Sequence, residues 1–317
     1  MCIICSSNPQ DLESLTILNC SNCPLLTSIP DTLVQLTTLN CFNCHLLTSI
    51  PDTLVQLTTL NCFGCSLLTS IPDTLTHLMT LNCFNCSLLT SIPETLVNLT
   101  HLECNYCTLM TNIPDTLVQL TELYCRGCSL LASIPETLSR LAKLNCSVCY
   151  LLTSIPTTLV SLTALNCCDC SLLTNIPDTL VQLIELYCYN CCLLTNIPNT
   201  LVQLNVLYCS ECSLLTSIPN TLVRLIILYC SECPLLTSIP NASLRILDCD
   251  NSPWLKQDIG VKKYTEKIKL LLNCQKYTRK WLSVYQRKRI QERHTKIVDE
   301  LLMVAMHPDR MEWLGLF

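Results

Sequence analysis

Hydrophobic and polar positions along residues 2–252 repeat with a period of 21 residues. With Leu15 as position 1, the unit is L-x-x-L-x-C-x-x-C-x-L-L-T-x-I-P-x-T-L-x-x, and it recurs twelve times. Each unit contains a short alternating segment such as 39–42, which is typical of a strand. The proline that follows cannot lie inside a sheet, so a turn and a return segment must come after each strand. A strict repeat of this length predicts a solenoid with all strands running the same way.

The predicted architecture is an α/β solenoid with one parallel sheet of about twelve coils, followed by an α-helical C-terminal tail. The return segment 52–57 is too short for an ordinary α-helix and is expected to be extended or to form a single 3₁₀ turn. Near the end of the array Cys230 and Cys249 stand 19 residues apart, which indicates a loop shortened by two residues. With strands about 4.8 Å apart, the coils would form a body roughly 55 Å long.

The unit resembles the leucine-rich repeat, in the short proline-containing form that some bacterial effectors and large DNA viruses carry. The resemblance covers residues 2–252 and implies a leucine-rich-repeat horseshoe that binds other proteins. If it extends to the viral repeat proteins, it also implies a host protein as the target and the host cytoplasm as the location. This chain departs from the family at position 6, usually Leu, and at position 9, usually Asn, because both are Cys. A thiol is a weaker hydrogen-bond donor than the Asn that usually forms a ladder there.

Charge divides the chain into two regions. Residues 1–252 contain 5 Lys and Arg against 17 Asp and Glu, whereas residues 253–317 contain 14 against 7. The sequence therefore predicts a solenoid domain over 1–252 and a basic, amphipathic helical cap or tail over 253–317. A cap would cover the open end of the core, but a basic helix could instead contact nucleic acid, an anionic membrane or a calmodulin-like groove. The basic face of the tail consists of Arg279, Lys280, Arg287, Lys288 and Arg289.

Several classes of function are disfavoured by composition. The chain has only 4 Gly, and none is spaced as a phosphate-binding loop. The 5 His do not recur in a register that pairs them with a cysteine and a carboxylate, so nucleophilic catalysis is not expected. No apolar run approaches the ~18 residues of a membrane span, and the N-terminus lacks the pattern of a signal peptide. We therefore expect a non-enzymatic, cytoplasmic protein without a cofactor.

The 28 cysteines allow two interpretations. Eleven Cys-x-x-Cys pairs at positions 6 and 9 could bind metal or carry redox chemistry. They could equally be small core residues, because a ladder of parallel thiols does not converge into a tetrahedral metal site. The sequence favours packing and predicts no metal site. Cys168 and Cys192 lie outside the pairs, and Cys168 at position 7 is expected to be the most exposed thiol of the array.

The exposed face of the sheet is expected at positions 3, 5, 7 and 8. Most aromatic side chains of the repeats fall there, together with acidic residues near the C-terminal end. Exposed aromatic side chains on a sheet are typical anchors of protein interfaces, although duplication of repeats could also have copied them as stacking ladders. The acidic end would suit a basic partner and would repel nucleic acid. The predicted binding residues are Phe42, Phe63, Phe84, Tyr106, Tyr124, Tyr187, Tyr189, Tyr208, Tyr229, Glu211 and Glu232.

Overall fold

The computed structural model describes residues 4 and 12–249. The chain separates into two compact units, Met1–Lys256 and Gln257–Phe317, and the described residues belong to the first. The tail predicted over 253–317, with its basic face at Arg279, Lys280, Arg287, Lys288 and Arg289, lies outside the described residues. Its helical form and its role as a cap therefore stay predictions.

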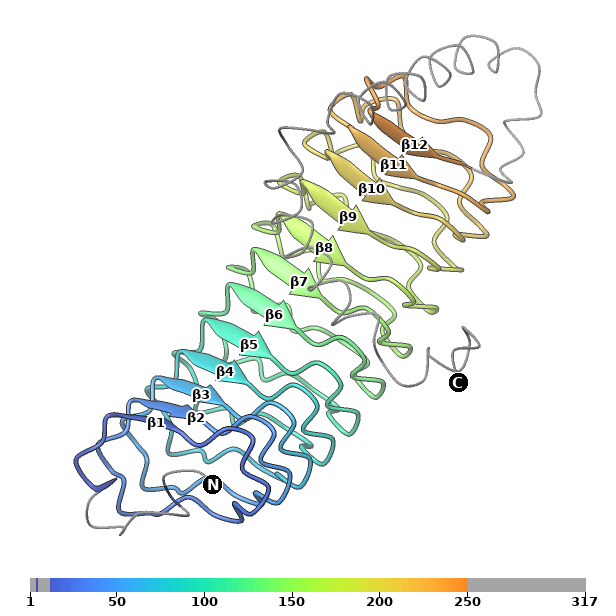
Figure 1. Cartoon of the computed structure of the whole chain (residues 1–317). Helices are drawn as coiled ribbons and strands as arrows, with labels where there is room; N and C mark the ends of the chain where they lie inside the picture. The colour runs from blue at the N-terminus through green and yellow to red at the C-terminus, as the bar shows by residue number, and fades with distance from the viewer. Residues whose placement is uncertain (1–3, 5–11, 250–317) are drawn as a thin grey trace, which may run out of the picture. The chain divides into compact units, whose positions relative to one another are not determined.

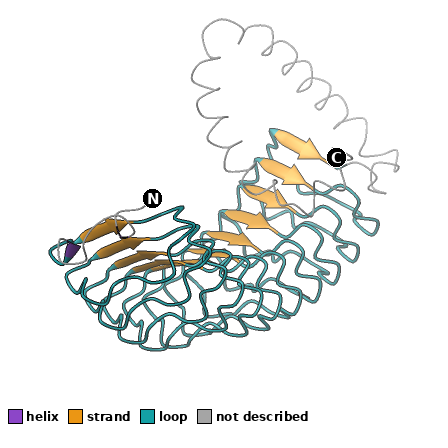
Figure 2. Cartoon of the chain, turned by 60° about the horizontal axis from the view of Figure 1, so that its bottom comes forward, coloured by secondary structure: helices purple, strands orange, loops and turns teal. Residues whose placement is uncertain are grey.

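Twelve short strands form one parallel sheet in which each strand pairs with the next one along the chain (Figure 1). In Figure 2 the described coils follow an arc, and the strands lie along its inner side. The predicted solenoid with one parallel sheet is confirmed. The strands are β1 (Ile17–Asn19), β2 (Thr38–Asn40), β3 (Thr59–Asn61), β4 (Thr80–Asn82), β5 (His101–Glu103), β6 (Glu122–Tyr124), β7 (Lys143–Asn145), β8 (Ala164–Asn166), β9 (Glu185–Tyr187), β10 (Val206–Tyr208), β11 (Ile227–Tyr229) and β12 (Ile246–Asp248).

The register of the sheet follows the sequence period. Leu18 pairs with Leu39, and the same step of 21 residues continues from strand to strand up to β11. Between β11 and β12 the step falls to 19, because Leu228 pairs with Leu247. The two missing residues therefore fall in the loop outside the sheet, and the parallel pairing of β11 with β12 is preserved.

The return segments are successive turns. In the coil that begins at Leu36, Leu54 N donates to Pro51 O at 3.4 Å and Leu57 N donates to Leu54 O at 3.1 Å. The described coils are built from strands and turns, so residues 12–249 form a β-solenoid rather than the predicted α/β solenoid, because the return segments are too short for a helix. The Thr at position 18 ties neighbouring turns together, since Thr53 Oγ1 donates to the carbonyl of Asp31 in the preceding coil at 2.6 Å. The same bond recurs along the array at 2.6–2.7 Å.

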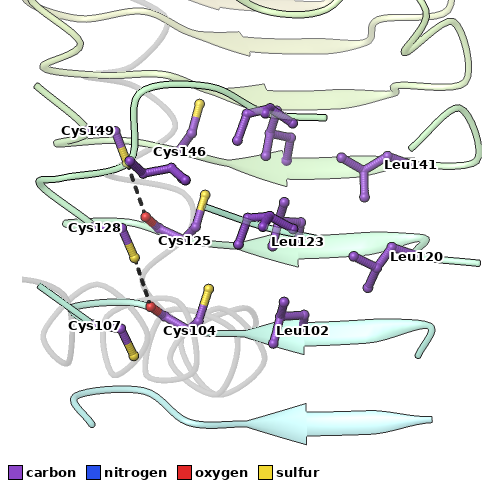
Figure 3. Packing of buried hydrophobic residues seen from close by; sticks show 14 of the residues in the cluster. Leu102, Cys104, Cys107, Leu120, Leu123, Cys125, Cys128, Leu141, Cys146 and Cys149 are labelled. Carbon is purple, nitrogen blue, oxygen red and sulfur yellow. Dashed lines mark hydrogen bonds between the residues drawn. The ribbon is translucent and has the colours of Figure 1, made fainter. Parts of the chain in front are cut away.

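The core contains seven side chains from each regular coil, at positions 1, 4, 6, 9, 12, 15 and 19. Leucines, one isoleucine and the two cysteines fill these positions, and they stack in columns from coil to coil (Figure 3). Each side chain contacts its own counterpart in the neighbouring coils, so the solenoid buries one continuous apolar core. The prediction that the Cys-x-x-Cys pairs are core residues is confirmed, because both columns are buried.

The residue at position 8 has a left-handed backbone in eleven coils, with φ between 54° and 70°. It ends the sheet segment, and its N–H donates to the next coil, as Asn43 N does to Phe63 O at 2.6 Å. Gly, Asn and Asp tolerate this conformation, and they occupy seven of the eleven positions. The other four coils have Tyr106, Val148, Glu211 and Glu232 there. Since longer side chains are disfavoured at positive φ, these four residues carry a local conformational cost.

Val148 gives a direct test of this cost, because β-branched residues are the least compatible with its φ of 61°. We expect Val148→Asn to raise the free energy of unfolding by about 1 kcal/mol. Thermal and urea unfolding of the full chain would measure the change. Val160→Asn is the matched control, since Val160 is exposed and is not among the residues with positive φ. A Val148→Asn variant that is no more stable than the control would contradict the expected relief of strain.

Candidate functional site

The predicted binding residues lie on the solvent-facing side of the sheet and at its edge after each strand. In most strands the middle residue is buried and its two neighbours are half-buried, which places positions 3 and 5 on the inner surface of the arc. The aromatic residues and Glu211 are half-buried, and Glu232 is exposed. The geometry therefore brings the predicted residues onto one face, as two aromatic groups with a charged centre between them.

The first aromatic group is built around Phe63 and Phe84. Their rings stack with centroids 4.6 Å apart, and Phe84 meets the edge of Tyr106 at 5.4 Å. Arg126 extends this group, because its guanidinium lies 5.8 Å from the centre of the Tyr106 ring and its Nε donates to Tyr106 Oη at 2.8 Å. Phe42 occupies the same column as Phe63, one coil earlier. Arg126 is a member of this surface that the sequence analysis did not single out.

The second aromatic group is a tyrosine ladder on β9, β10 and β11. Tyr187 and Tyr208 stack at 4.9 Å, and Tyr208 and Tyr229 stack at 4.3 Å. The rings cover one another's faces, so a partner would contact their edges and hydroxyl groups. Burial raises the pKa of Tyr208, which keeps its hydroxyl protonated and able to donate. The predicted stacking ladder is therefore present in the structure. It leaves only the ring edges and hydroxyl groups of the three tyrosines exposed for contact with a partner.

Asn and Tyr have different roles at position 5, which the sequence analysis did not distinguish. Asn40, Asn61 and Asn82 each accept a hydrogen bond from the backbone N–H two residues later, at 3.0–3.4 Å. This turn holds the chain at the end of the strand. A Tyr at the same position has no side-chain oxygen that can form this local bond. Coils with Tyr187, Tyr208 or Tyr229 therefore lack this Asn bond, and in the last of them the N–H of Ser231 donates instead to Ser210 Oγ of the preceding coil at 3.1 Å.

The charged centre is organised around Glu122 on β6. Its carboxylate lies 3.0 Å from Lys143 Nζ and 3.6 Å from His101 Nε2, and it accepts a hydrogen bond from Tyr124 Oη at 2.9 Å. Desolvation opposes ionisation of Glu122, but the hydrogen bonds from Lys143 and Tyr124 outweigh it and lower the pKa. These are the only ion pairs among the described residues, so Glu122 is the one acidic group of the sheet face with a cationic partner there.

Glu103 lies beside this centre without such a partner. It accepts hydrogen bonds from Asn82 Nδ2 at 2.8 Å and from Asn105 Nδ2 at 3.3 Å. Burial raises its pKa, and the hydrogen bond from Asn105 offsets only part of that rise. Glu103 is therefore a fixed acceptor in the middle of the face, and the sequence analysis did not identify it.

The cysteine columns form an ordered hydrogen-bond ladder inside the core. From Cys44 onward, the position-9 thiol of each coil donates to the carbonyl oxygen of the position-6 cysteine in the preceding coil, as Cys128 Sγ does to Cys104 O at 3.1 Å (Figure 3). A hydrogen bond between the two thiols, together with burial, raises the pKa of Cys104 well above its ordinary value, and the same bond lowers the pKa of Cys128 against the effect of burial. The thiols thus replace the expected Asn as donors, and their geometry supports packing rather than reactivity.

Cys168 and Cys192 are the two described cysteines that are partly exposed. Burial of its side chain raises the pKa of Cys168 to about 12, so this thiol is protonated at neutral pH. Among residues 4 and 12–249, no group of three or more His, Cys, Asp or Glu side chains could hold a metal ion. The same residues include no helix with the length and hydropathy needed to cross a membrane.

Thiol labelling distinguishes cysteines that are only packed in the core from cysteines that are chemically reactive. We expect the buried cysteines of the folded chain to resist N-ethylmaleimide, because the reagent cannot reach a thiol enclosed in the core. Cys168 and Cys192 should be modified first, and all cysteines should react once the chain is unfolded. Peptide mapping by mass spectrometry after timed labelling would measure the order. Early modification of Cys104 or Cys125 in the folded chain would contradict an inert core.

Comparison with known proteins agrees with this architecture. The sequence profile of the Leucine Rich Repeat family matches residues 14–36, 35–57, 56–78, 77–99 and 119–141. No curated protein matches the chain in sequence.

Among solved structures, the functional domain of InlJ from Listeria monocytogenes, which includes a cysteine ladder, is 25% identical with a TM-score of 0.64. The match covers 78% of this chain and 56% of the InlJ chain, so this chain spans just over half of that one. A leucine-rich-repeat protein from Leptospira interrogans is 21% identical over 76% of this chain and 74% of its own, with a TM-score of 0.57. The leucine-rich-repeat domain of the type III effector XopL is 23% identical over 62% and 76%, with a TM-score of 0.50. The matched repeats show that residues 14–99 and 119–141 are leucine-rich repeats, and the described coils share the fold of these solved structures.

Proposed function

We propose that the protein is a non-enzymatic interaction module that binds a protein partner on the inner face of its sheet. The aromatic groups supply the apolar contact, and the acidic residues of β9–β11 and the turns after them supply charge. Aromatic side chains are the commonest anchors of protein interfaces, and those on this face keep part of their surface available to solvent.

The observation that carries this proposal is that several residues of the face are costly to the fold. Glu211 and Glu232 have left-handed φ values of 59° and 57°, where seven other coils have Asn, Asp or Gly. Tyr187, Tyr208 and Tyr229 replace the Asn that forms a local hydrogen bond in other coils. Residues that a fold tolerates at a cost tend to gather at functional sites. Copying of repeats alone would reproduce the favourable residues as readily.

The partner and the compartment can be specified in part. An acidic face favours a basic protein surface and disfavours nucleic acid, whose phosphates it would repel. A reducing compartment such as the cytoplasm would keep the thiols from forming disulfides, so that they stay available as donors to the backbone. If the chain comes from a virus, the partner would be a host protein.

Replacement of the tyrosine ladder tests the proposed face. We expect Tyr187→Ser/Tyr208→Ser/Tyr229→Ser to lose partners that the wild-type chain captures from a cell lysate, because the aromatic anchors are gone. Quantitative mass spectrometry of the captured proteins would measure the loss. The matched control is Val181→Ser/Val202→Ser/Val223→Ser, which alters exposed apolar residues of the same region outside the sheet face. Identical capture by both folded variants and the wild type would rule out the tyrosine ladder as the binding surface.

The two strained glutamates allow a second test in which stability and binding change in opposite directions. We expect Glu211→Asn/Glu232→Asn to stabilise the fold, because Asn is tolerated at positive φ, and to weaken capture of the same partners. Thermal unfolding and the capture assay would be read on the same preparations. Val148→Asn should stabilise the chain without affecting capture. If Glu211→Asn/Glu232→Asn captures the same partners as the wild type, these two glutamates take no part in binding.

A further inference from the structure

Strands β6 and β9 carry the same tripeptide on the same three positions. Glu122-Leu123-Tyr124 forms β6, and Glu185-Leu186-Tyr187 forms β9. In both strands the tyrosine hydroxyl donates to the glutamate Oε2 two residues earlier, at 2.9 Å in β6 and 3.2 Å in β9. Both carboxylates are half-buried. The chain thus presents two copies of one carboxylate arrangement, each held by its own tyrosine.

The residues that pair with the two glutamates on the neighbouring strands are different. Glu122 pairs in register with His101 on β5 and with Lys143 on β7, and its carboxylate lies 3.0 Å from Lys143 Nζ and 3.6 Å from His101 Nε2. Glu185 pairs in the same way with Ala164 on β8 and Val206 on β10. Neither of these side chains can neutralise a carboxylate, and Glu185 forms no ion pair within the part of the chain that the structure describes.

The surroundings of Glu185 reinforce this difference. Positions 3, 5, 7 and 8 of the coils from β8 to β11, with positions 3 and 5 of β12, contain five acidic residues and no Lys, Arg or His. Their negative potential therefore adds to that of Glu185 and is not compensated on the face. The five acidic residues are Asp169, Glu185, Glu211, Glu232 and Asp248.

We propose that Glu185, held by Tyr187, is the docking site for a lysine side chain of the protein partner, in the place that Lys143 occupies beside Glu122. The arrangement at β6 is an internal precedent, because the same tripeptide accepts an ammonium group at 3.0 Å there. The hydrogen bond from Tyr187 fixes the carboxylate before a partner arrives, which reduces the ordering that binding requires. This inference rests on the proposed function and adds the chemistry of the partner: a lysine-bearing segment that follows the tyrosine ladder.

Filling the site from within the chain tests the proposal directly. Val206→Lys places a lysine opposite Glu185 in the register that Lys143 has opposite Glu122, and β7 shows that the sheet accepts lysine at this position. The probe is a fluorescein-labelled hexalysine peptide, titrated into the full-length chain at low ionic strength and followed by anisotropy. Val160→Lys adds the same charge at an exposed position outside the sheet face and is the matched control. We expect Val206→Lys to weaken binding by about fivefold more than the control does, the range for one ion pair at a partly exposed site.

The reverse change should create a second site. His101→Ala/Lys143→Val gives β5 and β7 the residues that β8 and β10 have beside Glu185. We expect this variant to bind hexalysine more tightly or with a higher stoichiometry than the wild type, because Glu122 then lacks the neighbouring lysine ammonium group and imidazole. Glu185→Gln should weaken binding more than Glu136→Gln, which removes an equal charge from an exposed position elsewhere.

The proposal would be overturned if Val206→Lys and Val160→Lys weakened hexalysine binding equally. It would also be overturned if His101→Ala/Lys143→Val did not increase hexalysine binding, because binding would then depend on net charge alone. The peptide titration does not depend on the natural partner, so it reports on Glu185 by itself. The capture assay with the tyrosine variants reports on the whole face. Peptide binding could respond to the Glu185 variants as expected while the tyrosine variants capture partners normally. That result would reject the tyrosine ladder as the binding face and retain the lysine site at Glu185. If Val206→Lys also abolishes capture of the natural partners, the lysine site at Glu185 is part of the proposed binding face.

Discussion

The structure depends on parallel pairing between coils of equal length. Each strand has only three residues, so it can be held only by a neighbour whose Leu and Cys columns coincide with its own. The constant step of 21 residues satisfies this requirement, and the thiol and threonine ladders add hydrogen bonds between coils at the ends of the strands and in the return turns. A coil contributes stability mainly through its neighbours, which is why inward positions vary so little while the outward positions of the sheet differ along the array.

That constraint also explains where chemical variety can appear. Positions 3, 5, 7 and 8 do not fill the core, so they can change from coil to coil without disturbing the register. Identical residues in neighbouring coils are brought close enough to stack, as Tyr208 and Tyr229 are at 4.3 Å. Opposite charges in neighbouring coils form pairs, as Glu122 and Lys143 do. The sheet face is therefore a row of adjacent side chains whose interactions are set by the residue 21 positions away.

Two kinds of conflict between local preference and fold distinguish this face from the rest of the solenoid. Glu211 and Glu232 occupy a left-handed position that favours Asn or Gly, and the tyrosines of β9–β11 displace an Asn that would cap the strand end. The left-handed conflict also occurs at Tyr106 and Val148, but at the acidic, tyrosine-rich end the two conflicts occur together, and Glu185 there has no counterpart of the ion pair between Glu122 and Lys143. Agreement between backbone strain, lost local bonds and unbalanced charge is more informative than any of them alone, because they have separate physical causes.

The period, the parallel sheet, the buried cysteine columns and the face that carries the aromatic residues can all be predicted from the residue pattern, because units that bury the same positions can stack in only one way. The left-handed position 8 was also readable, since Asn and Gly recur there, but its meaning required the observed φ values. Only the tertiary structure decided which rings stack, that a thiol donates to the preceding coil, and that Glu122 is paired while Glu185 is not. These features depend on side-chain rotamers and on distances between residues of different coils, which a pattern along one chain does not contain.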